Sequence, residues 1–150
     1  MATEEANAPR RRSHDRKHSE VQVRARQLGH RRVLVVDDEP LVRLFVKRAL
    51  SASGYDVIEA DSAERALELL ETEGDSLSLL LSDVGLPGAS GPELVQHARE
   101  AFPSLPTQLM SATPKDWLIN EHILPQAVDL LQKPFKVGEL FNRIEQLLHH

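Results

Sequence analysis

The sequence predicts an α/β fold, a doubly wound five-stranded parallel sheet with helices on both faces. The first observation is that short apolar runs alternate with amphipathic stretches five times after residue 32. The second is that the runs 33–36 and 77–81 are almost continuously apolar, as is typical of parallel strands buried on both faces. Because crossovers between parallel strands are right-handed, five such βα units form a three-layer sandwich.

Local patterns predict each element in turn. The predicted strands are 32–36, 55–60, 77–82, 106–110 and 127–131. The first helix ends near Gly54, and its apolar positions at helical spacing are Leu41, Leu44, Phe45, Ala49 and Leu50. The second helix is capped by Asp61 or Ser62, and the third begins at Pro92, a residue that suits a first helical turn. The fourth helix is expected between Pro114 and Pro125, and the fifth over 136–148.

Charge and composition divide the chain into two parts. Residues 1–32 contain nine Lys or Arg and four acidic residues, a net charge of +5, whereas residues 33–150 carry −10. We expect 1–31 to be a basic, mostly disordered extension, with a short helix possible only over 21–28, and 32–150 to be one domain. The absence of cysteine excludes disulfides and thiolate zinc sites, and no apolar run is long enough to span a membrane. These features predict a cytoplasmic protein.

Polar residues stand at the end of four of the predicted strands. Asp37 and Asp38 follow the first strand, Asp83 the third, Ser111 the fourth and Lys133 the fifth. The carboxyl ends of parallel strands meet at one edge of the sheet, where ligands bind in open α/β folds. Clustered carboxylates repel one another unless a cation is present, and Mg²⁺ is the hard, oxygen-preferring ion that suits them. The sequence therefore predicts an acidic metal pocket with a phosphate-binding rim.

Four segments together resemble the receiver domain of two-component response regulators. They are Val35-Val36-Asp37-Asp38-Glu39-Pro40, Ser82-Asp83-Val84-Gly85-Leu86-Pro87-Gly88, Met110-Ser111-Ala112 and Lys133-Pro134-Phe135. The intervals fit as well, with 45 residues from Asp38 to Asp83, 28 more to Ser111 and 22 more to Lys133. The resemblance covers about 32–150 and implies a flavodoxin-like (βα)5 sandwich with strand order 2-1-3-4-5.

The resemblance also implies a role for each site residue. Asp83 would accept a phosphoryl group as an aspartyl phosphate, with Ser111 and Lys133 contacting the phosphoryl oxygens. Mg²⁺ would be held by the carboxylates of Asp38 and Asp83 and the carbonyl of Gly85, with Asp37 orienting the metal or its waters. The Lys133–Pro134 bond is a candidate cis peptide, since X–Pro bonds adopt cis at modest cost.

One position departs from the family pattern. Receivers signal when the Ser or Thr hydroxyl moves toward the phosphoryl group and an aromatic residue on the fifth strand turns inward. The corresponding position here is Leu130, and 127–132 contains no aromatic residue. We therefore predict a muted readout at this strand, with the change carried by the fourth helix around Trp117.

The resemblance implies a signalling protein rather than an enzyme acting on a separate substrate, with only Mg²⁺-dependent self-phosphorylation and autodephosphorylation. The phosphodonor would be a histidine kinase or a histidine phosphotransfer protein. A downstream protein would bind the face formed by the fourth helix, fifth strand and fifth helix, without an attached output domain. We expect a monomer or weak dimer that binds neither a membrane nor nucleic acid.

Three alternatives remain open from the residues alone. The basic segment 1–32 is compatible with a DNA-associated regulator, whose binding would depend strongly on salt. An Asp-nucleophile phosphatase acting on small molecules is the second, although the adjacent pair Asp37-Asp38 and the separate Asp83 fit it poorly. The third is that the chain is a fragment of a hybrid kinase, because 86–94 looks similar to receivers attached to such kinases.

Overall fold

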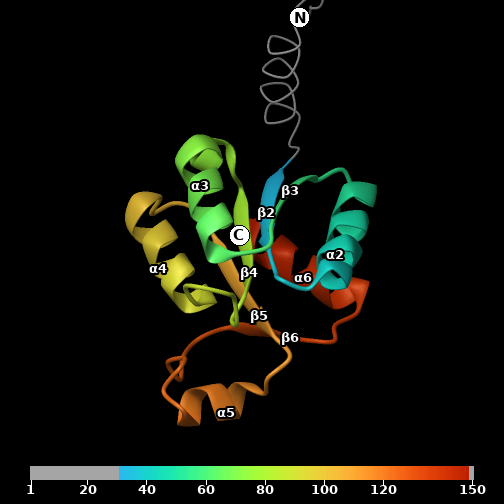
Figure 1. Ribbon diagram of the computed structural model, residues 1–150. Helices are drawn as coiled ribbons and strands as arrows, with labels where there is room; N and C mark the ends of the chain where they lie inside the picture. Colours follow the sequence, from blue (N-terminus) through green and yellow to red (C-terminus); the bar gives the residue numbers. More distant parts are fainter. Residues whose placement is uncertain (1–30, 149–150) are drawn as a thin grey trace, which may run out of the picture. The chain divides into compact units, whose positions relative to one another are not determined.

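The computed structural model describes residues 31–148, which form a parallel sheet between two layers of helices (Figure 1). The strands, labelled as in the figure, are β2 (Arg32–Val36), β3 (Asp56–Ala60), β4 (Leu79–Asp83), β5 (Thr107–Ser111) and β6 (Leu130–Gln132). The helices are α2 (Pro40–Ala52), α3 (Ala63–Glu73), α4 (Gly91–Ala101), α5 (Lys115–Asn120) and α6 (Val137–Leu148), with a 3-10 turn η1 (Gly74–Ser76).

The strands lie in the order β3-β2-β4-β5-β6, and every neighbouring pair is parallel. In sequence order this is 2-1-3-4-5, so the predicted flavodoxin-like topology is confirmed. The order of the first strands reverses between β2 and β4. Ligands in such sheets bind at this switch point, beyond the carboxyl ends of the strands.

Alternate residues of the central strands contribute to two separate cores. Leu34 and Leu80 belong to the core beneath α3, α4 and α5, whereas Val35 and Leu81 belong to the core beneath α2 and α6. All four side chains are fully buried. Figure 1 shows the corresponding helices on the two faces of the sheet. Burial on both faces explains the continuous apolar runs from which these strands were predicted.

The predicted apolar face of the first helix is partly wrong. In α2, Val46 and Leu50 are fully buried, as the packing of a surface helix requires. Leu41, Leu44 and Phe45, which were expected to face the core, are instead 79%, 40% and 40% exposed. The helix is rotated so that its inward stripe passes through Val46 and Leu50, and the three exposed residues form an apolar surface beside it.

The last strand is shorter than predicted, whereas the helix before it lies between Pro114 and Pro125 as predicted. Strand β6 comprises 130–132 rather than 127–131, because its register with β5 begins only at the pair Leu109 and Leu130. The preceding residues form a turn in which the Val128 amide donates to the carbonyl of Pro125. Helix α5 has six residues and does not fill the interval between its flanking prolines.

Other local predictions are confirmed. The Ser62 side chain caps α3 by accepting a hydrogen bond from the Arg65 amide at 3.1 Å, and the Lys133–Pro134 peptide is cis. The predicted extension lies outside the described residues apart from Arg31, and the predicted helix over 21–28 lies wholly outside them. Arg32, the last residue of the basic segment, forms ion pairs with Asp56 and Glu73.

Candidate functional site

The ends of four strands bring the predicted site residues to one edge of the sheet. Asp37 follows β2, Asp83 ends β4, Ser111 ends β5 and Lys133 follows β6. Backbone hydrogen bonds extend the sheet to this edge, since the Asp37 amide donates to the carbonyl of Ala60 at 3.1 Å. The Lys133 amide likewise donates to the carbonyl of Ser111 at 2.8 Å. The site therefore rests on the main chain of the sheet, which fixes its geometry.

Three carboxylates gather there, as the sequence predicted. One oxygen from each of Asp37, Asp38 and Asp83 lies within 4.8 Å of the others. Asp37 and Asp83 are buried, whereas Asp38 is exposed, so the cluster opens to solvent on one side. These are hard oxygen donors with room for water ligands, which is the donor set that Mg²⁺ prefers. The residues present thus fit a magnesium ion.

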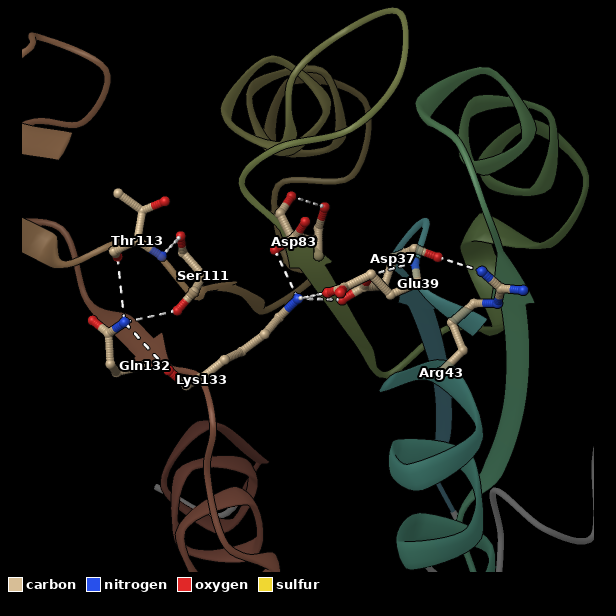
Figure 2. A network of polar contacts seen from close by, with 9 residues as sticks. Asp37, Glu39, Arg43, Asp83, Ser111, Thr113, Gln132 and Lys133 are labelled. Carbon is tan, nitrogen blue, oxygen red and sulfur yellow. Dashed lines mark hydrogen bonds and ion pairs between the residues drawn. The ribbon is translucent and has the colours of Figure 1, made fainter. Parts of the chain in front are cut away.

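Lys133 is the cation of this cluster. Its Nζ lies 2.6 Å from Asp37 Oδ2, 3.1 Å from Asp83 Oδ1 and 3.2 Å from Glu39 Oε1 (Figure 2). Burial lowers the pKa of Lys133, but the hydrogen bond to Asp37 and the charge of Asp83 outweigh burial and raise that pKa above its ordinary value. Lys133 therefore stays protonated at neutral pH.

Asp83 titrates well above an ordinary aspartate. Burial raises its pKa to about 6, Lys133 opposes that rise, and the charges of Asp37 and Asp38 add to it. A bound cation would favour the carboxylate and lower this pKa. At neutral pH Asp83 is already ionised, as a nucleophile must be.

Two residues of the network escaped the sequence analysis. Glu39 is the N-cap residue of α2, yet its side chain makes no capping bond and instead contacts Lys133. The guanidinium of Arg43 donates to the carbonyl of Asp37 at 2.6 Å and lies 3.5 Å from Glu59. These residues follow Asp38 by one and five positions, at the start of the helix. Their contact with the site could have been predicted, because the first turn of a helix packs against the strand end that precedes it.

Ser111 occupies a turn at the end of β5. Its Oγ accepts a hydrogen bond from the Thr113 amide at 2.9 Å, and the side-chain amide of Gln132 donates to the Ser111 carbonyl at 3.0 Å. Among the contacts described for 31–148, none joins Ser111 to Asp83. The structure thus places Ser111 at the predicted edge, with its hydroxyl oriented toward its own turn.

The loop after β4 is packed tightly at one glycine and is open at another. A Cβ on Gly91 would lie 2.0 Å from the carbonyl oxygen of Asp83, so no side chain fits there. Around Gly85, the predicted carbonyl ligand, a Cβ would meet nothing within 4 Å. Close packing at Gly91 fixes the nucleophile, while the surface above Gly85 leaves space for a partner.

Comparison with known proteins explains this geometry. The family model of the response regulator receiver domain matches residues 33–145. The chain belongs to this family. The resemblance read from the four sequence segments is therefore confirmed.

Curated relatives and solved structures agree with this assignment. The sensor kinase CckA of Brucella abortus is 32% identical over 80% of this chain, which spans only 13% of the kinase. The response regulator receiver protein CpdR of the same organism is 33% identical over 79% of this chain and 97% of its own length. The response regulator TrrA of Thermotoga maritima, solved in complex with Mg²⁺ and BeF, is 29% identical with a TM-score of 0.68, and the match covers 79% of this chain and 99% of TrrA.

Membership settles the general role of the chain. Receiver domains accept phosphoryl groups from histidine kinases in two-component and phosphorelay signalling, and they bind Mg²⁺ at an acidic pocket. This receiver is thus a phosphoacceptor of such a system. Within residues 31–148, none of the helices has the length and apolar character needed to cross a membrane.

Proposed function

We propose that this receiver takes a phosphoryl group onto Asp83 from a histidine kinase or a histidine phosphotransfer protein. The supporting observation is the arrangement at the strand ends, where the buried carboxylate of Asp83 lies 3.1 Å from Nζ of Lys133 and beside Asp37 and Asp38. A carboxylate, a fixed cation and a cation pocket are the parts that phosphoryl transfer requires.

Electrostatics make a metal ion necessary for this reaction. Asp37, Asp38, Glu39 and Asp83 carry four negative charges against the single positive charge of Lys133. An anionic donor would be repelled by this excess. Asp37, Asp38, Asp83 and the carbonyl of Gly85 would hold Mg²⁺, which supplies charge neutralisation of the phosphoryl oxygens when bound.

The transfer step uses the carboxylate directly. An oxygen of Asp83 attacks the phosphorus of the donor in line with the leaving group, so an acyl phosphate bond forms while the bond to histidine nitrogen breaks. The leaving imidazole keeps the electron pair of the broken bond and takes up a proton from solvent. Lys133 moves its contact from the free carboxylate to a phosphoryl oxygen, and the Ser111 hydroxyl donates to another.

The exposed apolar surface of α2 is the docking site that we assign to this phosphodonor. Its shallow groove, of about 470 Å³, is lined by Leu41, Leu44, Phe45, Arg48, Ala49 and Val137. The groove lies on the helix that begins directly after Asp37 and Asp38, so a helical partner with acidic residues opposite Arg48 would present its histidine to Asp83. Exposed apolar groups of this size mark protein–protein contact surfaces.

Output by protein contact, without catalysis on a separate substrate, completes the proposal. CpdR, a receiver protein matched over 97% of its length, supports this interpretation. The downstream contact would use the surface of α5, β6 and α6, where Trp117 of α5 is 52% exposed and Ile123, in the segment after α5, is 41% exposed. Partial exposure of large apolar side chains gives this surface the composition of a transient interface.

Intact mass after incubation with acetyl phosphate and Mg²⁺ tests the proposal. We expect one phosphoryl adduct on the wild type, none on Asp83→Asn, and none when the metal is chelated. Asp75→Asn, which alters an exposed acid in η1, is the matched control and should be modified like the wild type. An adduct that persists in Asp83→Asn would contradict the assignment, and transfer from a purified histidine kinase would then identify the acceptor.

A further inference from the structure

The side chain of Gln132 joins the two strands that end beside the phosphorylation site. Although this residue is exposed, its Nε2 donates to the carbonyl of Ser111 at 3.0 Å and to the carbonyl of Thr113 at 3.3 Å (Figure 2). We call these two hydrogen bonds the Gln132 latch. They extend from the end of β6 to both ends of one turn, so the turn cannot shift relative to β6 without breaking them.

The latched turn is in a resting geometry. The Ser111 hydroxyl oxygen accepts from the Thr113 amide at 2.9 Å, and Lys133, rather than Ser111, contacts Asp83. Contact between this hydroxyl and a phosphoryl group on Asp83 would break the hydrogen bond from the Thr113 amide and draw the turn toward the end of β4. The Ser111 carbonyl also accepts from the Lys133 amide at 2.8 Å, so the same oxygen connects the turn to the catalytic lysine.

Few other interactions hold β6 against β5 at this end. Only three residue pairs form the register of β5 and β6, from Leu109 and Leu130 to Ser111 and Gln132. At the opposite end of the pair, the buried Gln108 side chain donates to the carbonyl of Asp129 at 3.2 Å. A side-chain amide therefore braces each end of a very short strand, but only the Gln132 latch involves the turn that must move.

We propose that Gln132 is a positioning residue that holds the Ser111–Thr113 turn in its resting position and so opposes phosphorylation of Asp83. This inference rests on the proposed function of Asp83. Loss of the latch lowers the cost of moving Ser111 toward the phosphoryl group. Each of the two hydrogen bonds from this exposed amide stabilises the resting position of the turn modestly. Removing them should raise the equilibrium constant for the phosphorylated geometry by about threefold to fivefold.

The first test measures binding of beryllofluoride with Mg²⁺ to wild type, Gln132→Met and Gln108→Met. Methionine keeps the length of glutamine and removes its donors and its acceptor. We expect Gln132→Met to bind about threefold to fivefold more tightly. The matched Gln108→Met should lose stability but stay within about twofold of wild-type affinity, because its amide does not touch the turn. Equal or weaker binding by Gln132→Met would overturn the latch, as would equal tightening by Gln108→Met.

A second readout needs neither metal nor phosphoryl mimic. In the free protein, Gln132→Met should accelerate hydrogen exchange of the Thr113 and Lys133 amides about threefold and leave the Val35 amide unchanged. If the wild type binds no beryllofluoride, the proposed function is contradicted. Hydrogen exchange alone would then test whether Gln132 restrains the turn. Unchanged exchange rates at both amides would contradict the proposed role of the Gln132 latch. Faster exchange at these two amides alone would support its role as a restraint on the turn.

Discussion

The centre of the sheet and its β6 edge are stabilised in different ways. Strands β2 and β4 pair over four residues, and Val35 and Leu81 within them are completely buried. Strand β6 has three residues, of which only Leu131 is buried, and side-chain amides brace both of its ends. The nucleophile extends from the well-packed centre, whereas Lys133 and the Ser111 turn meet at the edge.

This difference separates the two tasks of a receiver. The chemistry needs a nucleophile and cation pocket that do not move, and a strand packed on both faces provides them. Signalling needs a part of the same site that can change position, and such parts come from the least stable end of a fold. Hydrogen bonds from exposed amides suit the edge because breaking them costs little.

The largest expected effect is on stability, from removing leucine side chains at the two places. Leu81→Ala in the fully buried centre should lower the free energy of unfolding by about 3 kcal/mol. Leu130→Ala, in a partly buried position, should lower it by about 1 kcal/mol because its neighbours can collapse or solvent can enter. Urea denaturation of wild type and both variants measures the two losses of unfolding free energy. Equal losses would contradict the contrast, because they would show that the edge is packed as well as the centre.

A smaller effect concerns the electrostatic cost of burying Asp83 at the end of the central strand β4. Since the folded-state pKa of Asp83 is about 6, against 3.8 for the unshifted group, its protonation stabilises the fold below pH 3.8 and that contribution disappears as pH rises through 6. A shift of this size corresponds to about 3 kcal/mol, which solvent screening at the open side of the site reduces. Without metal, Asp83→Asn should therefore be more stable than wild type at pH 8, by about 1 kcal/mol. Most of this gain should vanish at pH 4.5.

Thermal unfolding of both proteins at the two pH values, with and without Mg²⁺, measures this effect. Groups distant from Asp83 contribute equally in the two proteins and cancel in the difference, and Lys133, whose pKa is raised, stays protonated at both pH values. Mg²⁺ should reduce or reverse the gain at pH 8, because the wild type binds the ion through the carboxylate that the variant lacks. A stability difference that is independent of pH would mean that Asp83 is not destabilised by its surroundings.

The same contrast explains what could be predicted from the sequence. The runs that became β2 and β4 are apolar because both faces are buried, and Asp37, Asp38 and Asp83 were found because polar residues interrupt such runs conspicuously. At the edge, β6 was misplaced because 127–131 is apolar enough to resemble a strand, while the register with β5 decides its position. No pattern marked Gln132, whose role depends on carbonyls about twenty residues away in sequence.

The smallest expected effect concerns Leu130, which stands where the receiver resemblance implies an inward-turning aromatic residue. Leu130 packs against the core beneath α3, α4 and α5, and a leucine there has no ring to reorient toward the space that Ser111 leaves. Beryllofluoride should therefore change the amide chemical shifts of Thr113 and Gln132 more than that of Leu130, with further changes around Trp117. Shift changes at Leu130 as large as those near Asp83 would instead mean that β6 moves as a unit and that leucine transmits the signal as the aromatic residue does.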